Sequence, residues 1–132
     1  MRKVSLIMLL AALSSHASAE WVEVTGDEDA IGYADPTATS QLLGVVRMWE
    51  LVDYKTSRTF KSTIKPVTYF STLSQVEYRC MGNQLRRLGI TFYSEHMGKG
   101  EPVYSNPTTG EWVAIKPNSN GEAMWKLACA KK

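Results

Sequence analysis

A stretch of alternating residues, 76–93, constrains the fold most strongly, because it carries one of the only two cysteines in the chain. Within Val76–Cys80 apolar and polar side chains alternate, and the alternation resumes over Leu88–Tyr93. The residues between these runs, Met81-Gly82-Asn83, tolerate a tight turn. The pattern predicts two antiparallel strands with one covered face, and it places Glu77 on the opposite, polar face.

The second cysteine, Cys129, ends a segment with helical periodicity. Ser119 and Glu122 match the capping-box pattern at the start of a helix, and apolar residues then recur at helical spacing. We therefore predict a C-terminal helix that packs on the hairpin and is joined to it by a disulfide between Cys80 and Cys129. Such a bond would stabilise the fold by roughly 4 kcal/mol. Two unpaired buried thiols are the alternative.

Residues 1–19 have the features of a secretory signal peptide. Two basic residues precede a short apolar run, and the small residues Ala17-Ser18-Ala19 follow it. The apolar run is much shorter than the roughly 20 residues that span a bilayer, so we predict cleavage between Ala19 and Glu20 and no membrane span. No cysteine follows this site, so no lipid anchor is expected. The protein should be exported to the periplasm or to the cell surface and extracellular space, where disulfides form.

Removal of this segment changes the charge balance. The full chain has 15 basic and 13 acidic residues, and two of the bases lie in the predicted signal peptide, so residues 20–132 contain 13 of each. A neutral domain gives no general reason to expect nucleic-acid binding. The length of residues 20–132 suits a single domain.

The charges are nevertheless unevenly distributed. Residues 20–46 contain six acids and no base, whereas residues 54–76 contain four bases and no acid. The two regions can neutralise each other or be solvated, or the basic region can form a surface for a polyanion or an acidic partner. The candidate binding surface consists of Lys55, Arg58, Lys61 and Lys65.

The rest of the chain consists of short β-like runs separated by Gly- and Pro-containing turns. Residues 45–54 form the longest run, and apolar residues on both of its faces predict an interior strand. A strand at residues 31–34 should stop at Asp35-Pro36, and Thr37–Leu43 is ambiguous. The sequence predicts an α+β domain, in which a small antiparallel sheet of about five to six strands is packed by a C-terminal helix.

The sequence contains no recognisable catalytic or cofactor signature. Beyond the predicted signal peptide it has one histidine, His96, and the spacing of the cysteines fits no usual zinc pattern. Nucleophile-elbow, P-loop and dinucleotide-binding patterns do not occur. We predict a protein that is not an enzyme and has no metal or cofactor. The tryptophans lie in predicted strands and helix and are expected in the core: Trp21, Trp49, Trp112 and Trp125.

Taken in order, several short motifs resemble the surface-adhesin protein E-like family of Gram-negative bacteria. The motifs are Trp21-Val22, Tyr33-Ala34-Asp35, Val46-x-Met48-Trp49-x-Leu51-x-Asp53-Tyr54, Val76-Glu77-Tyr78-Arg79-Cys80, Arg86-Arg87-Leu88, Trp112-x-x-Ile115-x-Pro117 and Cys129. The resemblance implies an antiparallel sheet with helical cover and a disulfide between Cys80 and Cys129. It also implies a non-catalytic domain that binds host matrix or serum proteins and that can form a homodimer.

Three functions remain open on these grounds. The first is an exported, non-catalytic binding domain of adhesin type that uses the basic segment. The second is a periplasmic protein, such as an enzyme inhibitor or the binding partner of another protein. The third is a small hydrolase.

Overall fold

The structure is a computed structural model that describes residues 20–62 and 64–130. The predicted signal peptide, residues 1–19, lies outside the described residues. Seven strands, a short 3₁₀ helix and one α-helix follow one another along the described chain. They are β1 (Val22–Gly26), β2 (Ala30–Leu42), β3 (Val45–Lys61), β4 (Pro66–Arg79), β5 (Gln84–Tyr93), η1 (His96–Gly98), β6 (Pro102–Asn106), β7 (Val113–Ala114) and α1 (Asn120–Cys129).

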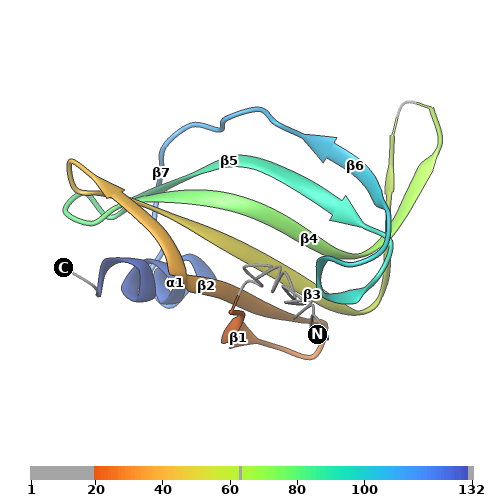
Figure 1. Cartoon of the computed structure of the whole chain (residues 1–132), viewed down its shortest axis with the longest axis horizontal. Helices are drawn as coiled ribbons and strands as arrows, with labels where there is room; N and C mark the ends of the chain where they lie inside the picture. Colours follow the sequence, from red (N-terminus) through yellow and green to blue (C-terminus); the bar gives the residue numbers. More distant parts are fainter. Residues whose placement is uncertain (1–19, 63, 131–132) are drawn as a thin grey trace, which may run out of the picture.

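The strands form one antiparallel sheet in which β1 to β6 lie side by side in sequence order (Figure 1). Strand β7 pairs with the end of β5 that β6 leaves free, so both short strands lie along the same edge of β5. The α+β class and the interior position of the run at residues 45–54, now part of β3, are confirmed. The predicted count of five to six strands is corrected to seven within the described residues.

The second strand is longer than the sequence predicts. Instead of ending at Asp35-Pro36, β2 continues to Leu42. Its pairing with β3 is interrupted between Asp35 and Ser40 and then resumes, so the irregularity falls where proline has no amide hydrogen for the ladder. The ambiguous segment Thr37–Leu43 is therefore the second half of β2 and the start of its turn.

Strands β3 and β4 extend beyond the rest of the sheet as a two-stranded arm, residues 58–69 (Figure 1). In the arm, pairing runs from Arg58 opposite Tyr69 to Lys61 opposite Pro66. The register shifts between Asp53 and Arg58, so β3 bulges at the base of the arm. The arm and the turns that join β2 to β3 and β4 to β5 consequently lie at opposite ends of the sheet.

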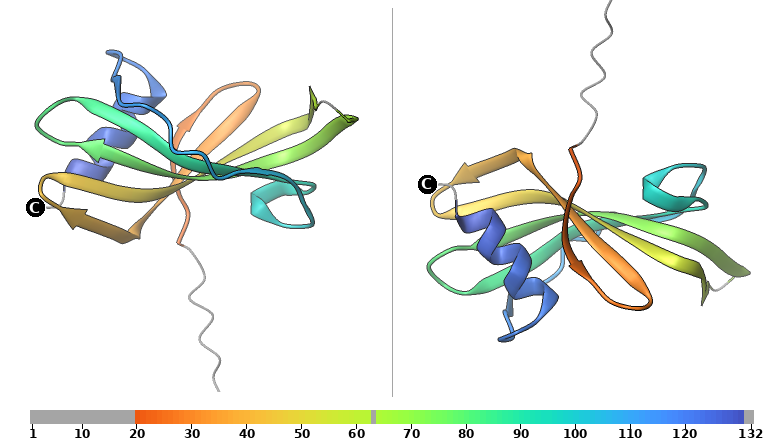
Figure 2. Two further views of the ribbon diagram at one scale, coloured as in Figure 1. Left: turned by 90° about the horizontal axis from the view of Figure 1, so that it is seen from above. Right: turned by 90° about the horizontal axis from the view of Figure 1, so that it is seen from below.

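Helix α1 crosses one face of the sheet near those two turns (Figure 2). Met124 and Ala128 of the helix are buried against Val46, Met48 and Tyr78 of the sheet. Burial of a side chain the size of Met contributes about 1.5–3 kcal/mol, so this contact is a large part of what holds the helix. The predicted disulfide is present and joins Cys80 to Cys129 at the end of the same contact, with 5.6 Å between the Cα atoms.

The start of α1 is capped largely as predicted. The hydroxyl oxygen of Ser119 accepts a hydrogen bond from the N–H of Glu122, with 3.2 Å between the two atoms. The Glu122 carboxylate accepts from the N–H of Asn118 at 3.4 Å, not from that of Ser119 as the capping box requires. The helix thus begins where the sequence indicates, with one of the two cap bonds displaced by a residue.

Candidate functional site

The four basic residues predicted to form a binding surface all lie on the arm or at its base, and all are exposed. Arg58 pairs with Tyr69 and Lys61 pairs with Pro66, so these two bases are three positions apart in one strand and leave opposite faces of the arm. Lys65 precedes β4 at the tip of the arm, and Lys55 lies in the bulge. The structure brings the four bases to one end of the sheet but not into one cluster.

Two of the four bases lie beside an acidic turn. The backbone N–H of Lys55 donates to the carbonyl oxygen of Asp29 at 2.9 Å, which fixes the bulge against the β1–β2 turn. Backbone hydrogen bonds from Ala30 and Asp29 lower the pKa of Asp27, and the positive charges of Lys55 and Arg58 lower it further. The uneven charge distribution is therefore partly neutralised at the base of the arm, which leaves Lys61 and Lys65 as its outermost bases.

A cluster of aromatic rings joins the arm to strands β5 and β6. Phe60 of the arm packs edge-on against Phe92 and Tyr104, with ring centroids 5.0 and 4.8 Å apart, and Tyr69 lies 4.5 Å from Phe92. Contacts of this kind contribute about 0.5–1.5 kcal/mol each beyond the area that they bury. The cluster was not predicted, because its members are brought together by the bulge in β3. It packs the arm against strands β5 and β6.

A cavity of about 560 Å³ lies between the sheet, the β1–β2 turn and the first turn of α1. Its lining includes Gly32, Glu50, Val76, Tyr78, Leu85 and Met124. Glu50 is a partly buried acid of this cavity, and its carboxylate accepts a hydrogen bond from the Tyr78 hydroxyl. The Glu50 carboxylate makes no other hydrogen bond within the described residues, so its second oxygen is left to the cavity.

The surroundings of Glu50 favour its neutral form. Burial raises the pKa of Glu50 to about 7, while the Tyr78 hydrogen bond and the positive charge of Arg87 act in the opposite direction. Burial, together with the negative charge of Glu50, also raises the pKa of Tyr78. Desolvation therefore outweighs the neighbouring cation and the hydrogen bond, and the neutral carboxylic acid is favoured in a cavity that Arg86 and Arg87 also line.

On the face of the sheet opposite α1, Glu77 is enclosed by two arginines. Its carboxylate lies 3.2 Å from Arg47 of β3 and 2.8 Å from Arg86 of β5. The prediction that Glu77 lies on a solvent-exposed polar face is wrong, since only 7% of the residue is exposed. Burial acts to raise the pKa of Glu77, but the hydrogen bonds from Arg86 and Arg47 outweigh it and the pKa is lowered.

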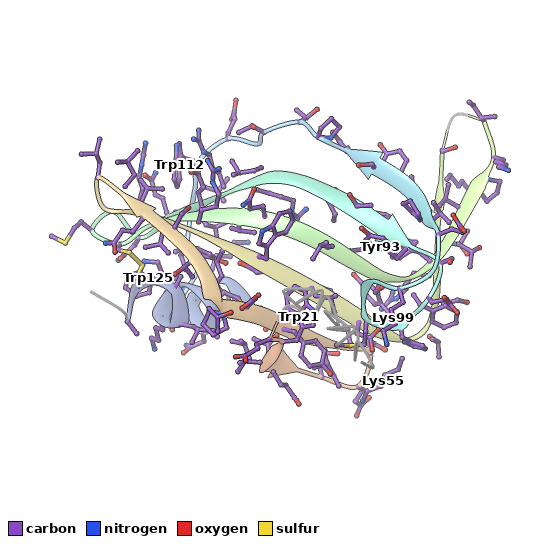
Figure 3. All side chains as sticks on the ribbon, viewed as in Figure 1. Trp21, Lys55, Tyr93, Lys99, Trp112 and Trp125 are labelled. Atoms are coloured by element: carbon purple, nitrogen blue, oxygen red, sulfur yellow. A yellow bond between two sulfur atoms is a disulfide. The ribbon has the colours of Figure 1, made fainter. Side chains whose placement is uncertain are left out.

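The prediction that the tryptophans lie in the core holds only in part: Trp125 is partly buried and packs against the core cluster, whereas Trp49 and Trp112 do not. None of the four is among the buried apolar residues of the described chain, and Trp49 is 38% exposed. Trp112 is stacked between cations: the guanidinium carbons of Arg79 and Arg86 lie 4.0 and 4.7 Å from the centre of its ring. Figure 3 places Trp112 and Trp125 toward the end of the sheet that carries the two turns, and Lys55 toward the other.

His96 lies half-exposed on η1. Its Nδ1 atom is 3.0 Å from a carboxylate oxygen of Asp53, and its ring packs on Phe70. Within residues 20–62 and 64–130, His, Cys, Asp and Glu side chains do not gather in groups of three that could hold a metal ion. In the same residues, no helix has the length and apolar composition of a transmembrane segment.

A match to a known protein family shows which family the chain belongs to. The family model of surface-adhesin protein E matches residues 21–130, which is nearly all of the described chain. The chain belongs to the surface-adhesin protein E family. Comparison with curated protein sequences gives no match.

Solved structures of Haemophilus influenzae protein E share the fold of this family member. One is 14% identical, covers 86% of this chain and 85% of its own, and superposes with a TM-score of 0.64. A second crystal form, also 14% identical, covers 86% and 88% with a TM-score of 0.65. Protein E from non-typeable Haemophilus influenzae, 15% identical, covers 92% and 82% with a TM-score of 0.62. These matches show that the fold is shared, and the family model is that of a surface adhesin.

Besides the aromatic cluster, two side-chain pairs of this surface-adhesin protein E domain were not predicted from the sequence. The Glu77–Arg86 pair could have been predicted, because a hairpin that turns at residues 80–83 places these two residues opposite each other. The Glu50–Tyr78 pair had no comparable signal, since it joins neighbouring strands at positions that no turn relates.

Proposed function

We propose that this member of the surface-adhesin protein E family is an exported, non-catalytic domain that binds an acidic protein partner through its arm. The observation that carries the proposal is the family match over residues 21–130. A host matrix or serum protein is the partner class that we propose, in keeping with the adhesin description of the family.

The arm has the features that a protein-binding surface needs. Lys61 and Lys65 supply positive charge that acidic residues at the base do not neutralise, and such charges accelerate association with an acidic partner. Ile64 lies between them in sequence and is 92% exposed, so it offers apolar area at the tip. The aromatic cluster holds the arm in place, so little conformational entropy is lost on binding.

The proposal is tested with protein that is purified after export and applied to immobilised matrix and serum proteins over a range of salt concentrations. A double variant, Lys61→Glu and Lys65→Glu, should bind about tenfold more weakly than wild type, and the wild-type affinity should fall as salt rises. The matched control, Lys99→Glu and Lys116→Glu, makes the same change of charge at exposed sites outside the arm and should bind as wild type does.

Equal losses in both double variants would show that net charge, and not the arm, governs binding. If wild-type protein binds none of these proteins but captures a periplasmic protein through Lys61 and Lys65, the partner class is wrong and the periplasmic alternative replaces it. Protease treatment of intact cells supplies the remaining check, because adhesion requires that the domain be digested from outside.

A further inference from the structure

Two turns at one end of the sheet expose large apolar side chains, and we call them together the turn surface. Leu42 and Leu43 of the β2–β3 turn are 74% and 94% exposed, and Met81 of the β4–β5 turn is 93% exposed. The N–H of Cys80 donates to the carbonyl oxygen of Gly44 at 3.2 Å, so the two turns are directly joined. Figures 1 and 2 show them side by side at the end of the sheet where α1 finishes.

The conformation of Leu43 makes its exposure more informative. Leu43 and Gly44 form a two-residue turn in which both have positive φ, at 54° and 77°. Such a turn favours Asn or Asp at the first position and Gly at the second, because a branched apolar side chain is strained at positive φ. Leucine at this position is strained at positive φ and exposes apolar area to water, whereas asparagine tolerates positive φ and has a polar side chain.

A basic groove of about 460 Å³ lies beside the exposed leucines. Leu42 and Leu43 line it together with Arg47, Arg86 and Trp112. Glu77 is the one acid among its lining residues, and Arg79 stacks on Trp112 from the side. Arg47 and Arg86 both pair with Glu77, so two arginines against one acid leave the lining of the groove with net positive charge, and Arg79 adds a cation beside it.

We propose that the turn surface docks on a membrane that contains anionic phospholipids. In this arrangement Leu42, Leu43 and Met81 enter the boundary between headgroups and acyl chains, while Arg47 and Arg86 contact a lipid phosphate in the groove. Apolar side chains beside arginines suit this boundary, because the arginine stems can lie in the apolar layer with their charges in the headgroup layer.

Charge and shape favour a membrane over a second copy of the chain. A symmetric dimer through the turn surface would place the same arginines of both copies against each other, which is unfavourable. The two turns also project from the end of the sheet, and a fluid lipid layer can receive a projection without a preformed pocket.

The test measures binding of exported, purified protein to sedimenting vesicles of phosphatidylcholine alone and of an equal mixture with phosphatidylglycerol. Wild-type protein should bind the anionic vesicles and not the neutral ones. Leu43→Asn should weaken vesicle binding about tenfold, because it removes a leucine from the apolar layer. The same variant should unfold at an equal or higher temperature than wild type, since Asn suits the turn, so weaker binding cannot be ascribed to misfolding.

The matched control is Ile64→Asn, which removes an equally exposed apolar side chain from the opposite end of the sheet and should leave vesicle binding unchanged. The proposal is overturned if wild-type protein ignores anionic vesicles, or if Ile64→Asn abolishes binding and Leu43→Asn does not. Binding of inorganic phosphate in the groove without vesicle binding would identify a free-phosphate site instead. A dimer that Leu43→Asn disrupts, in protein that does not bind vesicles, would identify a second copy as the occupant.

Discussion

Replacement of Glu50 by glutamine should change how the stability of the domain depends on pH. Burial raises the pKa of Glu50 from its ordinary value of 4.5 to about 7. Below pH 4.5 the carboxyl group is protonated in the folded and the unfolded chain, so it has no effect. Between 4.5 and 7 the unfolded chain loses the proton first, so rising pH favours unfolding. Above pH 7 the folded state carries the full penalty of a buried carboxylate.

The size of the effect follows from the two pKa values. Their difference corresponds to about 3 kcal/mol, at about 1.4 kcal/mol for each pH unit. Glutamine at position 50 keeps an oxygen that can accept from the Tyr78 hydroxyl, and it is neutral at every pH. The Glu50→Gln variant should therefore match wild type near pH 4.5 and exceed its stability by up to about 3 kcal/mol at pH 8. For a domain of this size that is about 13 °C in melting temperature.

The measurement is urea unfolding of both proteins at a series of pH values, plotted as the difference in free energy of unfolding. All other titratable groups are common to the two proteins, so their contributions cancel from the difference. Glu101→Gln, which changes an exposed carboxylate, is the control and should give a difference near zero at every pH. A wild-type protein that gains stability relative to Glu50→Gln between pH 5 and 8 would refute the argument from burial.

Three further changes test other parts of the structure. Loss of the disulfide in the double variant Cys80→Ser and Cys129→Ser should lower the free energy of unfolding by about 4 kcal/mol, and a loss below about 1 kcal/mol in urea unfolding would contradict this. Arginines lower the pKa of Glu77, so the ionised carboxylate stabilises the fold above pH 4.5, and this stabilisation is lost as pH falls through the lowered pKa. Glu77→Gln should therefore be less stable than wild type at pH 7, and the difference in free energy of unfolding should shrink at acid pH. Gly98 has φ of 69°, and an added Cβ would lie 3.1 Å from a methyl carbon of Leu51. Backbone strain and this close contact should make Gly98→Ala melt about 4–8 °C below wild type. An unchanged melting temperature would show that alanine is accommodated without strain.

The parts of the fold that rest on local patterns could be predicted from the sequence. The hairpin around residues 80–83 shows alternation on both sides of a turn, and Ser119 marks the start of α1 through its cap. With only two cysteines in the chain, a disulfide could join only Cys80 and Cys129. Each of these predictions needs a few neighbouring residues or one unique chemical partner, and none needs the three-dimensional register of the sheet.

The wrong predictions concern residues whose burial depends on strand register and on packing between neighbouring strands. Glu77 alternates with apolar neighbours and so suggests an exposed position, but Arg47 and Arg86 from the two adjacent strands cover it. Trp112 is large and apolar and so suggests a core position, but it lies at the edge of the sheet as a surface on which arginines stack. Sequence periodicity distinguishes two faces of a strand and cannot show which charged side chains of neighbouring strands reach across to cover one of them.

The arm and the turn surface are at opposite ends of one sheet, and this arrangement bears on how the two proposals combine. Strands β3 and β4 run from the turns into the arm, with a bulge in β3 at its base, and the aromatic cluster and the disulfide brace the two ends. A domain that rests on a membrane through Leu43 would therefore hold Lys61 and Lys65 away from the lipid. Anionic headgroups would then not compete with an acidic protein for the arm. It follows that Leu43→Asn should leave binding of the protein partner unchanged in solution, and that the Lys61→Glu and Lys65→Glu variant should still bind anionic vesicles. Loss of both partner binding and vesicle binding in either variant would show that the arm and the turn surface are not independent binding sites.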